Sequence, residues 1–183
     1  MTKAEMTKTF AAFFFAGCAF AQGPATVSGI FDGQLKTAES EIVSLVEAMP
    51  ADKMNFAPTN GQFKGVRTFA EQAKHVSAVL YIVTAAANEE KPPVDIGEGE
   101  SGPASVKSKD EVVKFLKDAF AYAHKVMGTL TAENLTKMVK SPFGQGQMAK
   151  GAAASLVVWH TFDHYGQMVV YARMNGIVPP ASR

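Results

Sequence analysis

Apolar residues recur at intervals of three and four in four stretches of the chain, and no stretch shows sustained alternation of apolar and polar positions. Intervals of three and four are typical of one face of an α-helix, whereas a half-buried strand alternates with a period of two. The pattern therefore predicts an all-α protein, a four-helix bundle without strands. The expected helices run from about Val27 to Met49, from Thr68 onward, from Ser108 to about Leu130, and from about Gln147 to Asn175.

Local signals support these helix ends. Pro50 stops the first helix, because proline lacks the N–H that a helix interior needs. The segments 68–71 and 108–111 fit capping boxes, in which a hydroxyl and a carboxylate satisfy backbone N–H groups at the helix start. Gly176 suits a left-handed position after the fourth helix, and Pro179 and Pro180 prevent its continuation. The stripes expected to face the core are Ile30, Gln34, Leu35, Ala38, Ile42, Leu45, Val46 and Met49, then Phe69, Ala73, Val76, Leu80 and Val83, then Val112, Leu116, Ala119, Ala123, Val126 and Leu130.

A segment rich in proline and glycine, residues 91–107, separates the second and third helices. Extended at about 3.4 Å per residue it reaches over roughly 50 Å, whereas a helix of about 22 residues is only about 33 Å long. The linker is thus long enough to cross the whole bundle, which would let the second and third helices run parallel. The alternative is a flap over a site, since linkers of this length are often functional.

Residues 1–21 have the features of a secretory signal peptide. Lys3 and Lys8 precede a short apolar run at 10–16, and Ala19 and Ala21 fit the small residues of a cleavage site. The apolar run is too short to remain as a membrane-spanning helix. We therefore expect a single exported domain, 22–183, in a periplasmic or extracellular location.

Two other interpretations of this leader remain open. In one, residues 15–18 are a lipobox, in which Cys18 would be acylated and would anchor the mature protein to a membrane. In the other, the leader is not cleaved and the protein is cytoplasmic. Cys18 is the only cysteine, so ordinary cleavage would leave a domain without a thiol, and any metal would be bound through nitrogen and oxygen.

Net charge excludes one class of partner. The formal net charge is +1, and no run of five or more like charges occurs. A nucleic-acid-binding protein is expected to carry a basic patch or stripe, so neither DNA nor RNA is a predicted partner.

The candidate chemistry lies in the histidines. His160 and His164 are four residues apart in the fourth helix, so both imidazoles project from one face toward a single point. Imidazoles on an apolar strip are costly to desolvate unless their nitrogens find partners, and a cation is such a partner. His75 on the second helix is the candidate for a third ligand, because bundle interiors build metal sites from side chains on facing helices. The competing interpretation is that these are hydrogen-bonded core or surface histidines.

Four further residues receive provisional roles. His124 lies off the apolar stripe of its helix and is expected to face solvent. Asp163 is interpreted as an acceptor that orients a histidine ring or a bound water, in preference to a fourth ligand or a solvated carboxylate. Gln167 and Tyr171 continue the face of His160 and His164 and are expected to offer polar contacts below the ion.

The sequence also resembles the DinB/YfiT-like proteins. The similarity is carried by residues 160–167 and 171–180 of the last helix and, upstream, by 48–50, 56–58 and 68–75. The resemblance implies a four-helix bundle of unusual connectivity in which His75, His160 and His164 bind a divalent ion, and it implies a homodimer. This chain departs from the family in having Tyr165 where an arginine often follows the last ligand.

Three neutral imidazoles leave a divalent ion with an open coordination position, which is typical of a catalytic site. Zinc in such a site lowers the pKa of bound water to about 7, so a hydrolase is one expectation, with Asp163 the only candidate general base. The resemblance implies a second, transfer of a low-molecular-weight thiol, although such thiols are kept mainly in the cytosol. The alternatives are a non-catalytic metal-binding or interaction module and a metal-free bundle. Zinc, nickel, copper and iron all accept nitrogen ligands.

Overall fold

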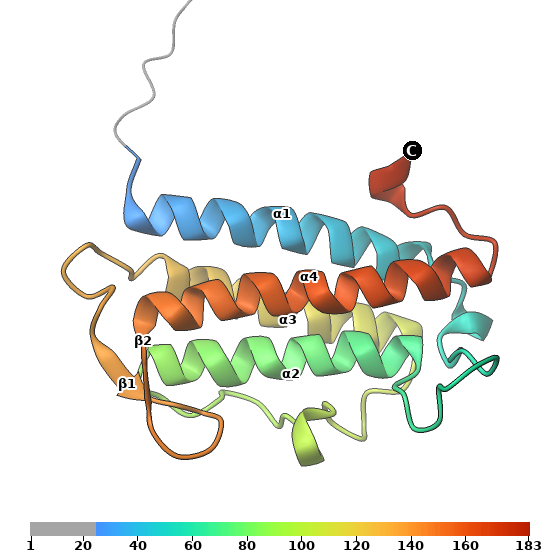
Figure 1. Cartoon of the computed structure of the whole chain (residues 1–183), viewed down its shortest axis with the longest axis horizontal. Coiled ribbons are helices and arrows are strands. Elements are labelled where there is room, and N and C mark those ends of the chain that lie inside the picture. Colours follow the sequence, from blue (N-terminus) through green and yellow to red (C-terminus); the bar gives the residue numbers. More distant parts are fainter. Residues whose placement is uncertain (1–24) are drawn as a thin grey trace, which may run out of the picture.

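A computed structural model describes residues 25–183, and these fold into a bundle of long helices (Figure 1). The predicted signal peptide, residues 1–21 with Cys18, lies outside the described range. None of the described helices is both long and apolar enough to cross a membrane. The elements are α1 Val27–Ala48, η1 Ala51–Lys53, α2 Phe69–Ala87, η2 Glu98–Glu100, α3 Lys109–Met127, β1 Met138–Lys140, β2 Gln147–Ala149, α4 Lys150–Met174 and η3 Pro180–Ser182.

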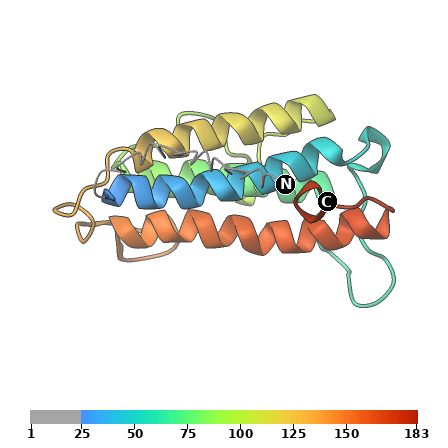
Figure 2. The same cartoon turned by 90° about the horizontal axis from the view of Figure 1, so that it is seen from above.

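Helices α2 and α3 run in the same direction, opposite to α1 and α4 (Figures 1 and 2). The linker 91–107 makes this possible, because it returns along α2 from one end of the bundle to the other and carries η2 on the way. The expected all-α four-helix bundle with a long crossover linker is confirmed. The linker length had left the direction of the second and third helices open, and the structure shows that they run parallel.

The predicted caps are formed. Thr68 and Ser108 each accept a hydrogen bond from the backbone N–H of the glutamate three residues later, and each glutamate accepts one in return. Gly176 has a φ of 75°, the left-handed conformation expected after the C-terminus of α4. These local signals set the start of α2, and therefore the position of His75 relative to the neighbouring helices.

Helix α2 is the most deeply buried of the four long helices. Of its 19 residues 16 are buried, because α3 and α4 pack against it and the linker covers the side that they leave. Every predicted core position on α2 and α3 is buried. On α1 the prediction was wrong at its first turns, where Ile30 is 50% exposed and Gln34 is also exposed.

The sequence did not predict the small antiparallel hairpin of β1 and β2. Met138 pairs with Ala149 and Lys140 with Gln147, so α4 begins at Lys150 and not at Gln147. Each strand has only three residues, which is too short to show an alternating pattern. The hairpin closes the connection between α3 and α4.

His124 also departs from the prediction. Its side chain is only 20% exposed and lies between α3 and α1, with Nδ1 2.5 Å from Asp32 and Nε2 3.0 Å from Glu39. A position at the flank of an apolar stripe meets a neighbouring helix when the helices pack closely. The acidic residues of α1 therefore hold a histidine that was expected to face solvent.

Candidate metal centre

Three histidines from two helices meet between α2 and α4. The ring centroids of His75, His160 and His164 lie 4.5 to 5.1 Å apart, and one ligand nitrogen of each lies within 4.8 Å of the others. The Nε2 atoms of His75 and His160 are 3.2 Å apart. The structure thus brings together the three residues that the sequence nominated as ligands.

The fold places these rings in a largely dry position. His75 and His164 are 6% and 8% exposed, and His160 is half-buried. One helical turn separates His160 from His164, so both face α2, on which His75 lies one turn after Gln72. A single ion between α2 and α4 could therefore contact all three residues.

The linker fixes the orientation of His75. Its Nδ1 lies 3.0 Å from the backbone carbonyl oxygen of Glu100 in η2. A carbonyl oxygen only accepts hydrogen bonds, so Nδ1 must carry the proton and donate it. The lone pair then resides on Nε2, the nitrogen that points toward the other two histidines, as in metal sites where an outer acceptor sets the tautomer.

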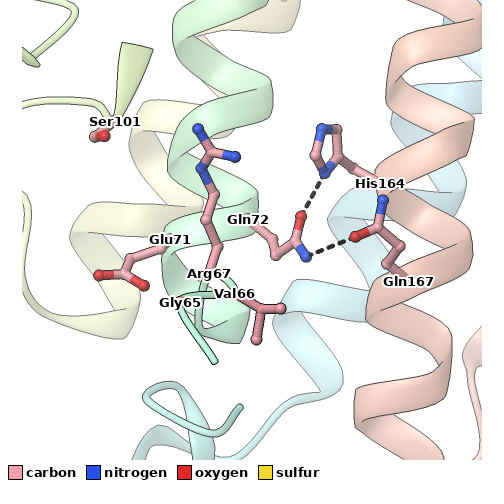
Figure 3. Close-up of a pocket in the computed structure, with 8 residues that line it drawn as sticks. All are labelled: Gly65, Val66, Arg67, Glu71, Gln72, Ser101, His164 and Gln167. Carbon is pink, nitrogen blue, oxygen red and sulfur yellow. Dashed lines mark hydrogen bonds between the residues drawn. The ribbon is translucent and has the colours of Figure 1, made fainter. Parts of the chain in front are cut away.

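A chain of amides fixes His164 in the same way (Figure 3). The Gln167 amide nitrogen donates to Asp163 at 3.3 Å, and the Gln72 amide nitrogen donates to the Gln167 oxygen at 3.0 Å. The remaining Gln72 oxygen accepts from Nδ1 of His164. Because the Asp163 carboxylate can only accept, the polarity of the whole chain follows, and Nε2 of His164 keeps its lone pair.

All three imidazoles are neutral at pH 7. Burial, with a smaller contribution from the neighbouring histidines, lowers the pKa of His160 to about 3 and that of His164 to about 4. Burial also lowers the pKa of His75, against the opposing effect of its hydrogen bond to Glu100. Neutral imidazole is the form that binds a metal, so protons compete little for these nitrogens.

These residues fit a divalent cation. Zinc–nitrogen bonds of about 2.0–2.1 Å in a tetrahedral arrangement require nitrogens about 3.3 Å apart. The Nε2 atoms of His75 and His160, 3.2 Å apart, are close to this spacing, and one ligand nitrogen of each of the three histidines lies within 4.8 Å of the others.

A family model described as the DinB superfamily matches residues 34–168, which include all three histidines. The chain belongs to the DinB superfamily. Three solved structures share the fold of this DinB protein. A DinB-like protein from Bacillus cereus ATCC 10987 has a TM-score of 0.66 at 16% identity and covers 85% of this chain and 96% of its own.

A DinB-like protein from Bacillus subtilis has a TM-score of 0.63 at 16% identity, with 80% of this chain and 92% of its own covered. A conserved protein from Enterococcus faecalis has a TM-score of 0.65 at 14% identity, with 82% and 98% covered. Among curated proteins, no match to this chain was found. The family and the fold are therefore established.

The DinB bundle opens to solvent beside the histidines. A cavity of about 590 Å³ has His164 in its wall, and its other lining residues come from α2, α4, the linker and the segment before α2. They are Gly65, Val66, Arg67, Glu71, Gln72, Ser101 and Gln167 (Figure 3). A volume of this size suits a small molecule.

The other nominated residues lie near the centre in different ways. Asp163 is exposed and forms no hydrogen bond with a histidine ring; hydrogen bonds through Gln167 and Gln72 link it to His164. Gln167 lines the cavity, whereas Tyr171 is buried and donates from its hydroxyl to the carbonyl of Arg67 at 3.3 Å. Direct contact of Gln167 and Tyr171 with a ligand stays a prediction.

Sequence reasoning missed Gln72, the Glu100 carbonyl and Arg67. A buried glutamine one turn before a nominated ligand is a usable signal, since buried amides need partners. A backbone carbonyl in a linker leaves no such signal in the sequence. Arg67 lies outside every predicted helix, and only the fold brings it to the histidines.

Proposed function

We propose that this DinB protein binds one divalent metal ion through Nε2 of His75, His160 and His164 and acts on a small molecule in the adjoining cavity. The observation that carries the proposal is that all three imidazoles converge while outer acceptors hold two of them in the ligating tautomer. A core histidine needs only a hydrogen-bond partner. Two outer acceptors that both direct lone pairs to a common point support a metal site.

The reaction class that fits is metal-dependent hydrolysis or group transfer. An ion on three neutral imidazoles supplies a Lewis acid with an open coordination position. The chain's own contribution is to hold its ligands neutral, to orient them and to provide a cavity beside them. Zinc, nickel and iron suit the nitrogen ligands, and the rigid geometry does not select among them.

A non-catalytic metal-binding module is the second candidate, and one observation favours it. Glu71 is the only carboxylate among the residues that line the cavity, and one of its oxygens already accepts from the backbone N–H of Thr68 at 2.7 Å. A general base is normally free to take a proton from the nucleophile. The cavity is therefore better equipped for binding than for proton transfer.

Metal content of the untagged protein tests the proposal first. Wild-type protein is expected to bind one ion per chain, and His160→Ala should lose most of it. His124→Gln removes a histidine that lies outside the centre, between α1 and α3, and should retain full stoichiometry. Equal metal content in wild-type and His160→Ala protein would show that the histidines form a hydrogen-bonded cluster only.

The chain carries its own reporter for this titration. Trp159 is the only tryptophan, its side chain is 58% exposed, and its ring lies 6.2 Å from that of His160. Nickel or cobalt bound at the centre should quench its fluorescence, whereas zinc should not. A screen of ester, amide and electrophile substrates with loaded and stripped protein then separates the enzyme from the binding module.

A further inference from the structure

Arg67 is the only cationic residue among those that line the cavity beside the histidines. It lies two residues before α2, and Figure 3 shows its side chain extending over α2 toward the level of Ser101 and His164. Its positive charge contributes, after burial, to lowering the pKa of His75, His160 and His164. The guanidinium is thus close enough to act electrostatically on the whole centre.

This guanidinium has no protein partner within residues 25–183. Arg67 is half-buried, and its side chain takes part in none of the ion pairs or hydrogen bonds of that range. Glu71 lines the same cavity but uses one carboxylate oxygen to cap α2. An arginine in a cavity normally finds a carboxylate or a phosphate, because its planar fork matches two oxygens at once. In this protein the position that a carboxylate or phosphate would occupy beside the Arg67 guanidinium is open to a ligand.

The backbone holds Arg67 in place. Its carbonyl oxygen accepts from the Tyr171 hydroxyl of α4 at 3.3 Å, and the next residue, Thr68, caps α2. The Tyr171 ring in turn packs edge-on against Phe56, with centroids 5.8 Å apart. The start of the side chain is therefore fixed relative to both helices that carry the histidines, which lowers the entropy lost on binding.

The surroundings favour a carboxylate over a phosphate. Phosphate sites commonly use free N–H groups at a helix N-terminus, but those at the start of α2 are occupied. The N–H groups of Phe69 and Ala70 donate to the carbonyls of Phe56 and Met54 at 2.9 and 2.8 Å, and that of Glu71 donates to the Thr68 hydroxyl. The Glu71 carboxylate in the wall also repels a dianion more than a monoanion.

We propose that Arg67 is the anchoring residue for a carboxylate group of the small molecule that enters this cavity. With Arg67 holding the carboxylate, the rest of the ligand extends toward His164 and the open face of the metal. The inference rests on the proposed function for its claim that the bound acid is the substrate. The recognition of a carboxylate by Arg67 itself stands on the cavity and does not need the ion.

Three matched probes test this subsite: benzoate, its neutral analogue benzamide, and the dianion phenyl phosphate. Binding is measured by ligand-observed NMR and calorimetry on zinc-loaded and metal-free protein. Arg67→Met removes the charged fork and keeps a long side chain. Lys64→Met removes the same charge from an exposed residue of the same loop that does not line the cavity, and serves as the control.

We expect wild-type protein to bind benzoate at least tenfold more tightly than benzamide or phenyl phosphate. Arg67→Met should weaken benzoate binding about tenfold to a hundredfold, the range of a lost charge-assisted pair of hydrogen bonds. Lys64→Met should stay within about twofold, and both variants should bind metal as the wild type does. Arg67→Lys should recover only part of the affinity, since lysine cannot form the planar fork.

The outcomes separate this inference from the proposed function. The carboxylate subsite would be refuted by unchanged benzoate binding in Arg67→Met, by equal affinity for benzamide, or by a preference for phenyl phosphate. If the same protein still bound one metal ion, the metal centre would stand. Conversely, Arg67-dependent benzoate binding by a protein that takes up no metal would support the subsite and refute the metal centre.

Discussion

Gln72 determines which nitrogen of His164 is free to bind a metal. Its amide oxygen accepts from Nδ1 of His164, and its amide nitrogen is engaged by Gln167. Gln72 is itself only 3% exposed, so solvent water cannot replace a hydrogen-bond partner that its amide loses. Because the acceptor and the ring belong to different helices, this one side chain couples the geometry of α2 to the ligand on α4.

Replacing Gln72 with leucine is therefore expected to weaken metal binding about 10- to 100-fold, the usual effect of losing a hydrogen-bonding partner of a ligating histidine. Gln167→Leu, which keeps the direct contact of Gln72 with His164 and removes only the outer link, should cost less than about tenfold. Titration with nickel, followed through Trp159 fluorescence, gives both affinities. Equal losses in the two variants would show that Gln72 does not orient the ring.

At this scale the sequence predicted that His75, His160 and His164 lie together, but not the groups that hydrogen-bond to them. Histidines at helical spacing on an apolar strip can be recognised because desolvation demands a partner. The acceptor for His75 is the backbone carbonyl of Glu100. Every residue has such a carbonyl, so no side-chain pattern in the sequence predicts which one lies beside His75. Asp163 is linked to His164 through the amides of Gln167 and Gln72, and this link depends on tertiary packing that the sequence does not show.

Among the elements, the linker 91–107 acts on the histidine centre directly, because its Glu100 carbonyl accepts a hydrogen bond from His75. Its turn from Gly97 to Gly102 is closed by a hydrogen bond from the Gly102 N–H to the Ile96 carbonyl at 2.8 Å, and Glu100 lies inside it. Gly97 has a φ of 72°, and a Cβ there would lie 2.0 Å from the Gly102 carbonyl oxygen. The backbone of this turn approaches itself too closely for any side chain at Gly97.

Gly97→Ala should consequently displace the turn and remove the acceptor of His75, with a loss of metal affinity of roughly tenfold or more. Gly99→Ala is the matched control, because Gly99 also has a positive φ of 55° but a Cβ there would meet nothing within 4 Å. Both variants carry backbone strain, and only the first carries the clash. Metal affinity together with amide hydrogen exchange of the linker distinguishes them; if Gly99→Ala lost as much affinity, strain alone would explain the effect.

The helices themselves were predictable because several local signals agree. Capping boxes at Thr68 and Ser108 predicted the starts of α2 and α3 to the residue, and stripes of apolar residues predicted the buried faces of both helices. Two features could not be predicted from the sequence, for physical reasons. Three-residue strands carry no readable period, and His124 is buried by carboxylates of α1 that only the packing of α1 on α3 brings near. Linker length permitted parallel helices, but only the structure showed that the chain uses that length.

At the scale of the whole molecule, the centre joins the two halves of the bundle. His75 belongs to the pair of helices that run one way, and His160 and His164 belong to α4, which runs the other way. An ion bound there links helices that are distant in sequence, so metal and global stability are coupled. Export of the domain and its assembly into a homodimer remain predictions, the first resting on residues outside the described range.

The same coupling predicts how the metal-free protein responds to acid. An unfolded histidine titrates near pH 6.5, whereas in the folded state the pKa is about 3 for His160, about 4 for His164 and lowered for His75. The unfolded chain therefore binds more protons below pH 6.5, and the stability contributed by the neutral imidazoles, complete above that pH, is lost as the pH falls toward the folded values. Each histidine contributes up to about 1.4 kcal/mol per pH unit.

Between pH 6.5 and 5 most carboxylates stay ionised, so this window isolates the histidines. Urea unfolding of stripped wild-type protein should show a steep fall in the free energy of unfolding across it. His160→Gln should reduce the slope by up to about one third, because a neutral amide takes up no proton in either state. Zinc-loaded protein should resist the same acidification until the ion is released, since ligand nitrogens cannot bind metal and proton together. A free energy of unfolding that does not change over this window would show that the three imidazoles titrate alike in the folded and unfolded states, and would contradict their burial as neutral groups.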